Sequence, residues 1–313
     1  MRKVGLIGPP NRPELERLAI RLEERGGGAV FIDSSRDPGI VVAREQLRAC
    51  GEDLASLAAI YVADLGLRAP GASDADGSAD PEAGGAALGH SMRQLAAWNT
   101  LFHCFAGRGG LVVNPPAAQA LHALKPHEVA WYRQSGIPAP RTLATTDAAA
   151  LASLGTESVG GWIVKQLVGG YAHTERFEPP RTREAARRVL DGGPILVQEE
   201  IEGRNVRAFV VAGETIGAAA FIPLDGSEID SRRGEARIQR VDLPEEAARY
   251  AERAAQQWGM TFAAIDFMHE ETTGRYVVLE CNSAPFFVAF EACTGVEVSG
   301  RLANHLLGIR RKR

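Results

Sequence analysis

The sequence has few of the features that mark secreted, metal-thiolate or membrane proteins. Its four cysteines, Cys50, Cys104, Cys281 and Cys293, include no C-x-x-C pair, which predicts free thiols in a reducing compartment. The seven histidines are dispersed without metal-ligand spacing. No secretory signal is visible at the N-terminus, and no apolar run approaches the roughly 18 residues of a membrane-spanning helix. We therefore expect a soluble, cytoplasmic protein without a membrane partner.

The net charge gives no support for a nucleic-acid partner. The 313 residues carry a formal net charge of −4, whereas nucleic-acid binders concentrate positive charge. The basic run at 310–313 is most simply a solvated tail, although a binding role for it stays open.

Lysine is scarce. Lys and Arg together number 35, yet only Lys3, Lys125, Lys165 and Lys312 are lysine. Because arginine is used almost wherever a cation is needed, an internal lysine indicates a place for a compact ammonium group that arginine cannot imitate. Chance survival is the simpler interpretation for Lys3 and Lys312, which lie near the termini.

The first part of the chain, residues 1–110, has the pattern of an α/β domain. Short apolar strands are predicted in "MRKVGLIGPP", "AVFID" and "LAAIYVADL". Between the first two, Leu15, Leu18 and Leu22 form one stripe of a helix that glycines terminate. The segment 69–89 begins with a run lacking aromatic and β-branched residues and is predicted to be a flexible insert. A helix should follow over about 90–107.

The remainder has the pattern of an α+β fold. Short strands such as "WIVKQL", "ILVQEEI" and "EARIQRVDL" predominate, and "VVAGE" predicts a hairpin turn. Antiparallel sheets with few helices are the arrangement this favours. We expect two subdomains, 111–195 and 196–313. The second should contain a helix at 244–258, strands at 262–269 and 275–282, and a last helix at about 295–307.

Two of these strands carry acids among apolar residues. Glu280 and Asn282 end the strand "VVLECN", and Asp266 lies in "FAAIDFMH". The two strands are joined by a short loop, so Asp266 can lie beside Glu280 in a hairpin. Carboxylate and amide oxygens suit Mg²⁺, which would also offset the cost of burying charge. A solvent-exposed strand end, where these residues need no partner, is the alternative.

The internal lysines stand where phosphate could be bound. Lys165 ends an apolar strand and precedes a loop with Gly169 and Gly170, a combination that can hold phosphates. Lys125 precedes a predicted helix. The strand "PILVQEEIEG" runs into a turn, and its backbone could bind the edge of an adenine.

In this order, "LKPHEVAWYRQSGIPAPRT", "WIVKQLVGG", "ILVQEEIEGRNVRAFVVAGE", "AAIDFM" and "VVLECNSAP" resemble the ATP-grasp ligases, particularly their RimK-like branch. The resemblance covers about residues 111–308. It implies antiparallel sheets that clamp ATP, usually two Mg²⁺ ions, and a carboxylate activated as an acyl phosphate that an amine or a hydroxyl attacks. It also implies a role for each of several residues. Lys125 and Lys165 would hold the phosphates, Glu199 and Ile201 would bind adenine through their backbones, Leu279 would pack against the base, and Asn205 would lie at the ribose. Asp266, Glu280 and Asn282 would bind magnesium, and Arg207 would face the phosphate or the acceptor.

The sequence departs from the family pattern in places. Asn205 stands where the family commonly has an acid at the ribose, which would weaken ATP binding. The glycine loop is reduced to Gly169 and Gly170, and Phe286 replaces a usual glycine. The last two departures affect the expected identity of the substrate more than the expected nucleotide site.

A further match points to one branch of this family. Asp230-Ser231-Arg232 is similar to the D-x-R motif of the graspetide (microviridin-type) macrocyclases, which link side-chain carboxylates of a precursor peptide to its Ser, Thr or Lys side chains. The resemblance implies that Arg232 neutralises the acyl phosphate and oxyanion and that Asp230 accepts the proton of the nucleophile. A charged surface loop is the alternative.

We therefore expect an ATP-dependent ligase that cross-links side chains of a precursor peptide. A RimK-like ligase that adds free amino acids to a peptide, or joins two small molecules, is the second hypothesis. A non-catalytic nucleotide-binding scaffold and a kinase are hypotheses of other classes. The N-terminal domain is a candidate site for the acceptor or a leader peptide. The sequence leaves open whether the chain forms a homo-oligomer.

Overall fold

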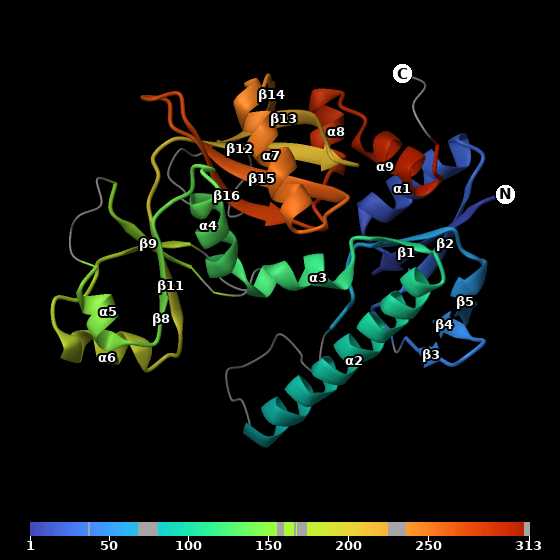
Figure 1. The fold of residues 1–313 in the computed structure, drawn as a ribbon, viewed down its shortest axis with the longest axis horizontal. Coiled ribbons are helices and arrows are strands. Elements are labelled where there is room, and N and C mark those ends of the chain that lie inside the picture. Colours follow the sequence, from blue (N-terminus) through green and yellow to red (C-terminus); the bar gives the residue numbers. More distant parts are fainter. Residues whose placement is uncertain are drawn as a thin grey trace. The chain divides into compact units, whose positions relative to one another are not determined.

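The computed structural model describes residues 1–36, 38–67, 81–154, 160–165, 167, 174–224 and 236–309 (Figure 1). The chain divides into two compact units. The first unit contains Met1–Pro116, Ala284–Val288 and Glu297–Arg313, and the second contains Ala117–Ser283 and Ala289–Val296. No helix in these described ranges is long and apolar enough to cross a membrane.

The first unit is built on a parallel sheet with the strand order β2-β1-β6-β7. Its strands are β1 (Lys3–Gly8), β2 (Gly28–Asp33), β6 (Ala59–Val62) and β7 (Leu111–Val113), and its helices are α1 (Pro13–Glu24), α2 (Pro81–Gly107) and α9 (Val298–Leu306). A small antiparallel sheet contains β3 (Val41–Val42), β4 (Leu47–Ala49) and β5 (Glu52–Asp53), and the 3-10 helix η1 (Leu54–Ser56) follows it. The predicted α/β character and the buried stripe of Leu15, Leu18 and Leu22 are confirmed.

Helix α2 begins earlier than the sequence predicted. It spans Pro81–Gly107, so residues 81–89 are helical and the expectation of a flexible insert over them was wrong. Proline is well tolerated in a first helical turn, and Ala83, Ala86 and Ala87 favour a helix. Together, these two effects outweigh the low helix propensity of Gly84 and Gly85. Residues 69–80 of that predicted insert lie outside the described residues.

Helix α9 belongs to the first unit, although the sequence analysis assigned 297–313 to the C-terminal subdomain. It packs beside α1 (Figure 1), and Arg25 Nε donates to Asn304 Oδ1 at 2.8 Å. Leu302 and Leu306 on α9 are buried. Such long-range packing leaves no local signal in the sequence, which explains the misassignment.

The second unit contains two antiparallel sheets, with the orders β10-β9-β11-β8 and β14-β13-β12-β15-β16. The first comprises β8 (Thr142–Thr145), β9 (Trp162–Lys165), β10 (Glu175–Phe177) and β11 (Ile195–Glu199); the second comprises β12 (Arg204–Val211), β13 (Glu214–Pro223), β14 (Ala236–Val241), β15 (Phe262–His269) and β16 (Tyr276–Asn282). The predicted antiparallel α+β architecture is confirmed. The predicted "VVAGE" turn lies at Ala212 and Gly213, which both have positive φ, as a tight hairpin requires.

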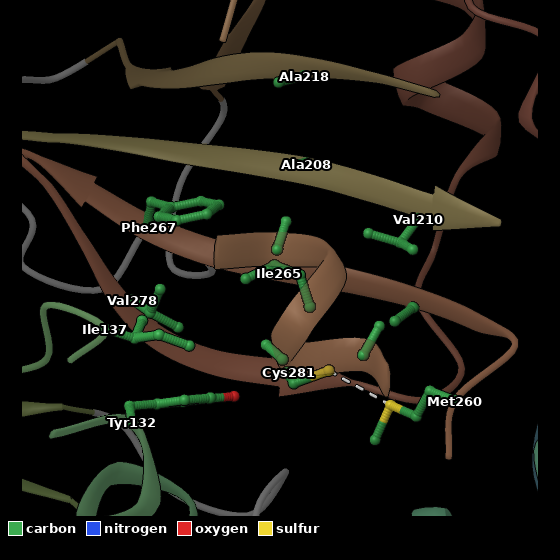
Figure 2. Close-up of a cluster of buried hydrophobic side chains, with 14 of the residues drawn as sticks. Tyr132, Ile137, Ala208, Val210, Ala218, Met260, Ile265, Phe267, Val278 and Cys281 are labelled. Atoms are coloured by element: carbon green, nitrogen blue, oxygen red, sulfur yellow. Dashed lines mark hydrogen bonds between the residues drawn. The ribbon is translucent and has the colours of Figure 1, made fainter. Parts of the chain in front are cut away.

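The helices of this unit are α3 (Pro116–Gln119), the 3-10 helix η2 (Ala120–Ala123), α4 (Lys125–Gln134), α5 (Ala148–Ala152), α6 (Arg183–Leu190), α7 (Glu245–Gln257) and α8 (Val288–Thr294). Helices α4 and α7 pack on one face of the larger sheet (Figure 2). Alternate residues of β12, namely Val206, Ala208 and Val210, point into this core. Since strand residues alternate between faces, Arg207 points to the opposite face.

Candidate functional site

The candidate site begins at the β15–β16 hairpin. Asp266 lies directly opposite Glu280 in the ladder, as the sequence predicted. The register shifts by one residue next to this pair, so that Phe267 pairs with Val278 and Leu279 is the extra residue of a β-bulge. Bulges commonly re-aim side chains beside functional sites. This bulge allows Val278 and Cys281, three residues apart, to face the same core, while Glu280 stays opposite Asp266.

Arg207 and Asn282 hold Asp266 from two sides. Arg207 Nε and Nη2 donate to Asp266 Oδ1 and Oδ2 at 2.6 and 2.9 Å, a bidentate pair. Asn282 Nδ2 donates to Asp266 Oδ2 at 2.9 Å. Burial disfavours the charged guanidinium, but Asp266 outweighs this effect and raises the pKa of Arg207. Bidentate pairing fixes the direction of both groups as well as their separation.

Glu280 is paired with Lys125, the first residue of α4. Lys125 Nζ donates to Glu280 Oε2 at 2.7 Å. Burial would raise the pKa of Glu280, but Lys125, with smaller contributions from Lys165 and Arg207, lowers it to about 2. The carboxylate is therefore ionised at neutral pH. The sequence pattern predicted a metal ion as the partner of these buried charges; in the structure, Lys125 pairs with Glu280 and Arg207 pairs with Asp266.

Lys165 is held by a chain of hydrogen bonds across neighbouring strands. Its Nζ donates to Gln198 Oε1 at 2.8 Å, and Gln198 Nε2 donates to Thr142 Oγ1 at 3.0 Å. Gln198 is only 3% exposed, so its amide has a fixed orientation. Gln198 was not among the site residues predicted from the sequence, although a glutamine at the end of the apolar run "ILVQ" indicates a buried polar group that needs a partner.

The expected adenine-binding residues come from both sheets. Glu199 ends β11, and its N–H donates to Arg141 O at 2.8 Å. Val278, beside Leu279 on β16, donates its N–H to Pro138 O at 2.8 Å. The short segment from 138 to 141 therefore ties Glu199 and Leu279 together, and four residues span at most roughly 14 Å. Ile201 follows β11, and Asn205 lies on β12 opposite Met268.

Asp230 and Arg232, together with Gly169 and Gly170, lie outside the described residues.

The donors that are described fit a divalent cation with few protein ligands. Asp266 and Glu280 offer carboxylate oxygens, and Asn282 keeps Oδ1 as an oxygen donor because its nitrogen faces Asp266. In the part of the chain that the structure describes, no group of three or more His, Cys, Asp or Glu side chains could hold a metal. A magnesium ion here would therefore complete its shell with other oxygens, such as those of phosphates.

Lys125 and Lys165, together with the carboxylates of Asp266 and Glu280, lie in a unit built of antiparallel sheets. A model of the RimK-like ATP-grasp domain matches residues 134–306. The chain belongs to the RimK-like ATP-grasp family. This confirms the resemblance drawn from the sequence motifs.

Curated relatives of this ATP-grasp chain include glutamate ligases. The tetrahydromethanopterin:alpha-L-glutamate ligase of Methanosarcina acetivorans is 33% identical over 175 residues, 51% of this chain and 54% of that protein. A probable alpha-L-glutamate ligase of Picosynechococcus is 30% identical over 48% of this chain and 52% of its own length. The chain spans about half the length of these curated relatives.

Solved ATP-grasp structures match nearly the whole chain. The ligase PsnB, in complex with a phosphomimetic variant of a minimal precursor, Mg and ADP, is 29% identical, with a TM-score of 0.79 over 98% of both chains. The macrocyclase MdnC of Microcystis aeruginosa, bound with the precursor peptide MdnA, is 18% identical, with a TM-score of 0.75 over 98% of this chain and 99% of that one. The likeness to MdnC supports a shared fold.

Proposed function

We propose that this chain is an ATP-dependent ligase that cross-links side chains of a peptide through ester or amide bonds. The observation that carries the proposal is the match to PsnB, a ligase solved with a precursor peptide, over 98% of both chains. The reaction would activate a side-chain carboxylate as an acyl phosphate, which a hydroxyl or an amine of the same peptide then attacks. ATP and Mg²⁺, with two ions as the family pattern implies, are the expected cofactors.

The described side chains suit these tasks. Lys125 and Lys165 would hold the phosphates, and Asp266, Glu280 and Asn282 would bind magnesium, which supplies charge neutralisation at the phosphates. Glu199 and Ile201 would bind adenine through their backbones, with Leu279 against the base and Asn205 at the ribose. Lys125 and Arg207 already neutralise the two carboxylates. These two ion pairs therefore carry no net charge before any ligand enters, which limits the cost of keeping them partly buried.

Arg207 can serve the acceptor side of the reaction. Its guanidinium also lies over the ring of Phe221, 5.4 Å from the centroid, so it is oriented from two directions. Arg232 would neutralise the oxyanion, and Asp230 would accept the proton of the nucleophile.

The role of Lys165 predicts that arginine cannot replace it. Lys165→Arg should lose ATP affinity nearly as severely as Lys165→Ala, about 10–100-fold. A planar guanidinium cannot take the place of an ammonium bonded to the fixed Gln198 amide. Titration with ATP and Mg²⁺ measures this. Lys3→Arg, at an exposed position of β1, is the matched control and should be silent. Normal ATP binding by Lys165→Arg would remove Lys165 from the phosphate site.

Peptide cross-linking is tested by the mass of the product. A candidate precursor rich in Thr, Glu and Asp, incubated with the protein, ATP and Mg²⁺, should become lighter by whole water molecules, because each new bond expels one water. Tandem mass spectra should lack fragments inside the linked region. Arg232→Ala should form no such product and still bind ADP.

The curated relatives favour a second candidate function, the addition of free amino acids to an acceptor. In that case the acceptor would become heavier by one residue when glutamate is supplied, and water loss would not occur. ADP release that depends on a carboxylate, with a product free of phosphate, distinguishes either ligase from a kinase. Nucleotide binding without any ADP release would instead support the hypothesis of a non-catalytic nucleotide-binding scaffold.

A further inference from the structure

Glu128 is a buried acid to which none of the proposed roles is assigned, although it lies within the motif "LKPHEVAWYRQSGIPAPRT". It lies on α4, one turn after Lys125, and is 2% exposed. Its Oε1 accepts hydrogen bonds from the Tyr132 hydroxyl and from the backbone N–H of Cys281, both at 2.5 Å. A carboxyl group buried this deeply is costly unless its partners are well placed, so its contacts indicate what it does.

Cys281 is the residue between Glu280 and Asn282. Strand β16 is at the edge of its sheet among the described strands, so N–H groups that point away from β15 need acceptors from elsewhere. Pro138 O serves Val278, and Glu128 Oε1 serves Cys281. Between these two bonds lies the bulge at Leu279, where the ladder itself is interrupted. The Glu128 bond therefore fixes the backbone where strand pairing is weakest.

Fixing Cys281 also directs its neighbours. The Cys281 side chain points into the core (Figure 2), so Glu280 and Asn282 must both point to the opposite face. Helix α4 thus holds β16 twice, through Lys125 on Glu280 and through Glu128 on Cys281. We propose that Glu128 is a positioning residue that, through the backbone of Cys281, holds Glu280 and Asn282 in the orientation needed to bind the magnesium nucleotide. This role rests on the proposed function.

The electrostatics agree with this geometry. Burial raises the pKa of Glu128 to about 8, with Glu280 adding to the rise, while the bonds from Tyr132 and Cys281 and the charge of Lys125 oppose it. Burial also raises the pKa of Tyr132 and of the Cys281 thiol, so both are neutral. A neutral Glu128 does not compete with Glu280 for Lys125. The contacts from Tyr132 and Cys281 thus call for a hydrogen-bond acceptor of this shape at this position.

Three substitutions separate these requirements. Glu128→Gln keeps an acceptor oxygen in a side chain of the same shape, Glu128→Leu removes it, and Glu128→Asp withdraws it by one methylene. Gln134→Leu, at an exposed position of the same helix, is the matched control. The first readout is amide hydrogen exchange over 276–283 without nucleotide. Exchange at Cys281 should be faster in the Leu and Asp variants and unchanged in the Gln variant.

The second readout is the affinity for ADP, measured with Mg²⁺ and with EDTA. The gain in affinity that Mg²⁺ gives should fall roughly 10–100-fold in Glu128→Leu and in part in Glu128→Asp, and stay at the wild-type level in Glu128→Gln. A purely structural role would lower both affinities together and leave the gain unchanged.

The outcomes distinguish this role from the proposed function itself. A wild-type protein whose ADP affinity gains nothing from Mg²⁺ would overturn the proposed magnesium nucleotide site, and this role with it. If the Leu and Asp variants gain as much ADP affinity from Mg²⁺ as the wild type does, only the role of Glu128 is overturned. A Gln variant as impaired as the Leu variant would overturn it as well, since the position would then require charge. If the Leu variant does not fold, the Asp variant decides.

Discussion

Glu280→Gln should reduce ligase turnover by at least about a hundredfold. Loss of a group that only orients a metal ligand costs roughly 10–100-fold, and Glu280 is proposed as a ligand itself. The substitution keeps the size of the side chain and removes a negative charge that attracts Mg²⁺ beside the phosphates. It also leaves Lys125, whose Nζ lies 2.7 Å from Glu280 Oε2, without its carboxylate. Carboxylate-dependent ADP production is the measurement.

A matched control separates this effect from the loss of any ion pair. Glu245→Gln removes the carboxylate from an exposed pair with Arg249 on α7, whose side chains are 86% and 57% exposed. Such surface pairs contribute little, so turnover should stay at the wild-type level. Wild-type ADP production by Glu280→Gln would remove Glu280 from the proposed magnesium site.

The same variant should be modestly less stable at neutral pH. The pKa of Glu280 is about 2 in the folded protein against an ordinary value of 4.5. A lowered pKa means that the ionised form stabilises the fold above pH 4.5 and that this contribution is lost as the pH falls towards 2. The stability difference between wild type and Glu280→Gln should therefore be on the order of 1–3 kcal/mol at pH 7 and shrink below pH 4.5.

Local pattern was sufficient to predict the parts of the fold that depend on neighbouring residues. The turn between β15 and β16 is short, so the two strands had to pair, and the placement of Asp266 opposite Glu280 followed. The stripe of Leu15, Leu18 and Leu22 identified α1 for the same reason. In these cases the spacing of apolar residues fixes which side chains share a face.

The remaining features depend on contacts between distant residues. The bulge at Leu279 shifts the strand by one residue and is visible only once Val278 and Cys281 are both found in the core. Lys125 was expected to hold phosphate, but its pairing with Glu280 joins positions 155 residues apart. The place of α9 in the first unit is likewise set by packing on α1. No local propensity records these contacts, so the sequence could not predict them.

Glu128→Gln should make the protein more stable than wild type at neutral pH. In wild type the unfolded chain loses the Glu128 proton near its ordinary pKa of 4.5, whereas the folded protein keeps it up to about 8. Between these values the folded state binds more protons, so the free energy of unfolding falls as the pH rises. Glutamine does not titrate in either state, and the variant lacks this decline.

The difference in unfolding free energy, variant minus wild type, should therefore grow from pH 4.5 to about 8 and then level off. One pKa unit corresponds to about 1.36 kcal/mol, so the difference should reach several kcal/mol. Urea unfolding in EDTA, without nucleotide, at a series of pH values from 5 to 9 measures it, with Glu245→Gln as the exposed control. Parallel curves for wild type and Glu128→Gln would mean that Glu128 is ionised in the folded protein. Tyr132 and the Cys281 N–H would then be bonded to a buried charge, with Lys125 already engaged by Glu280.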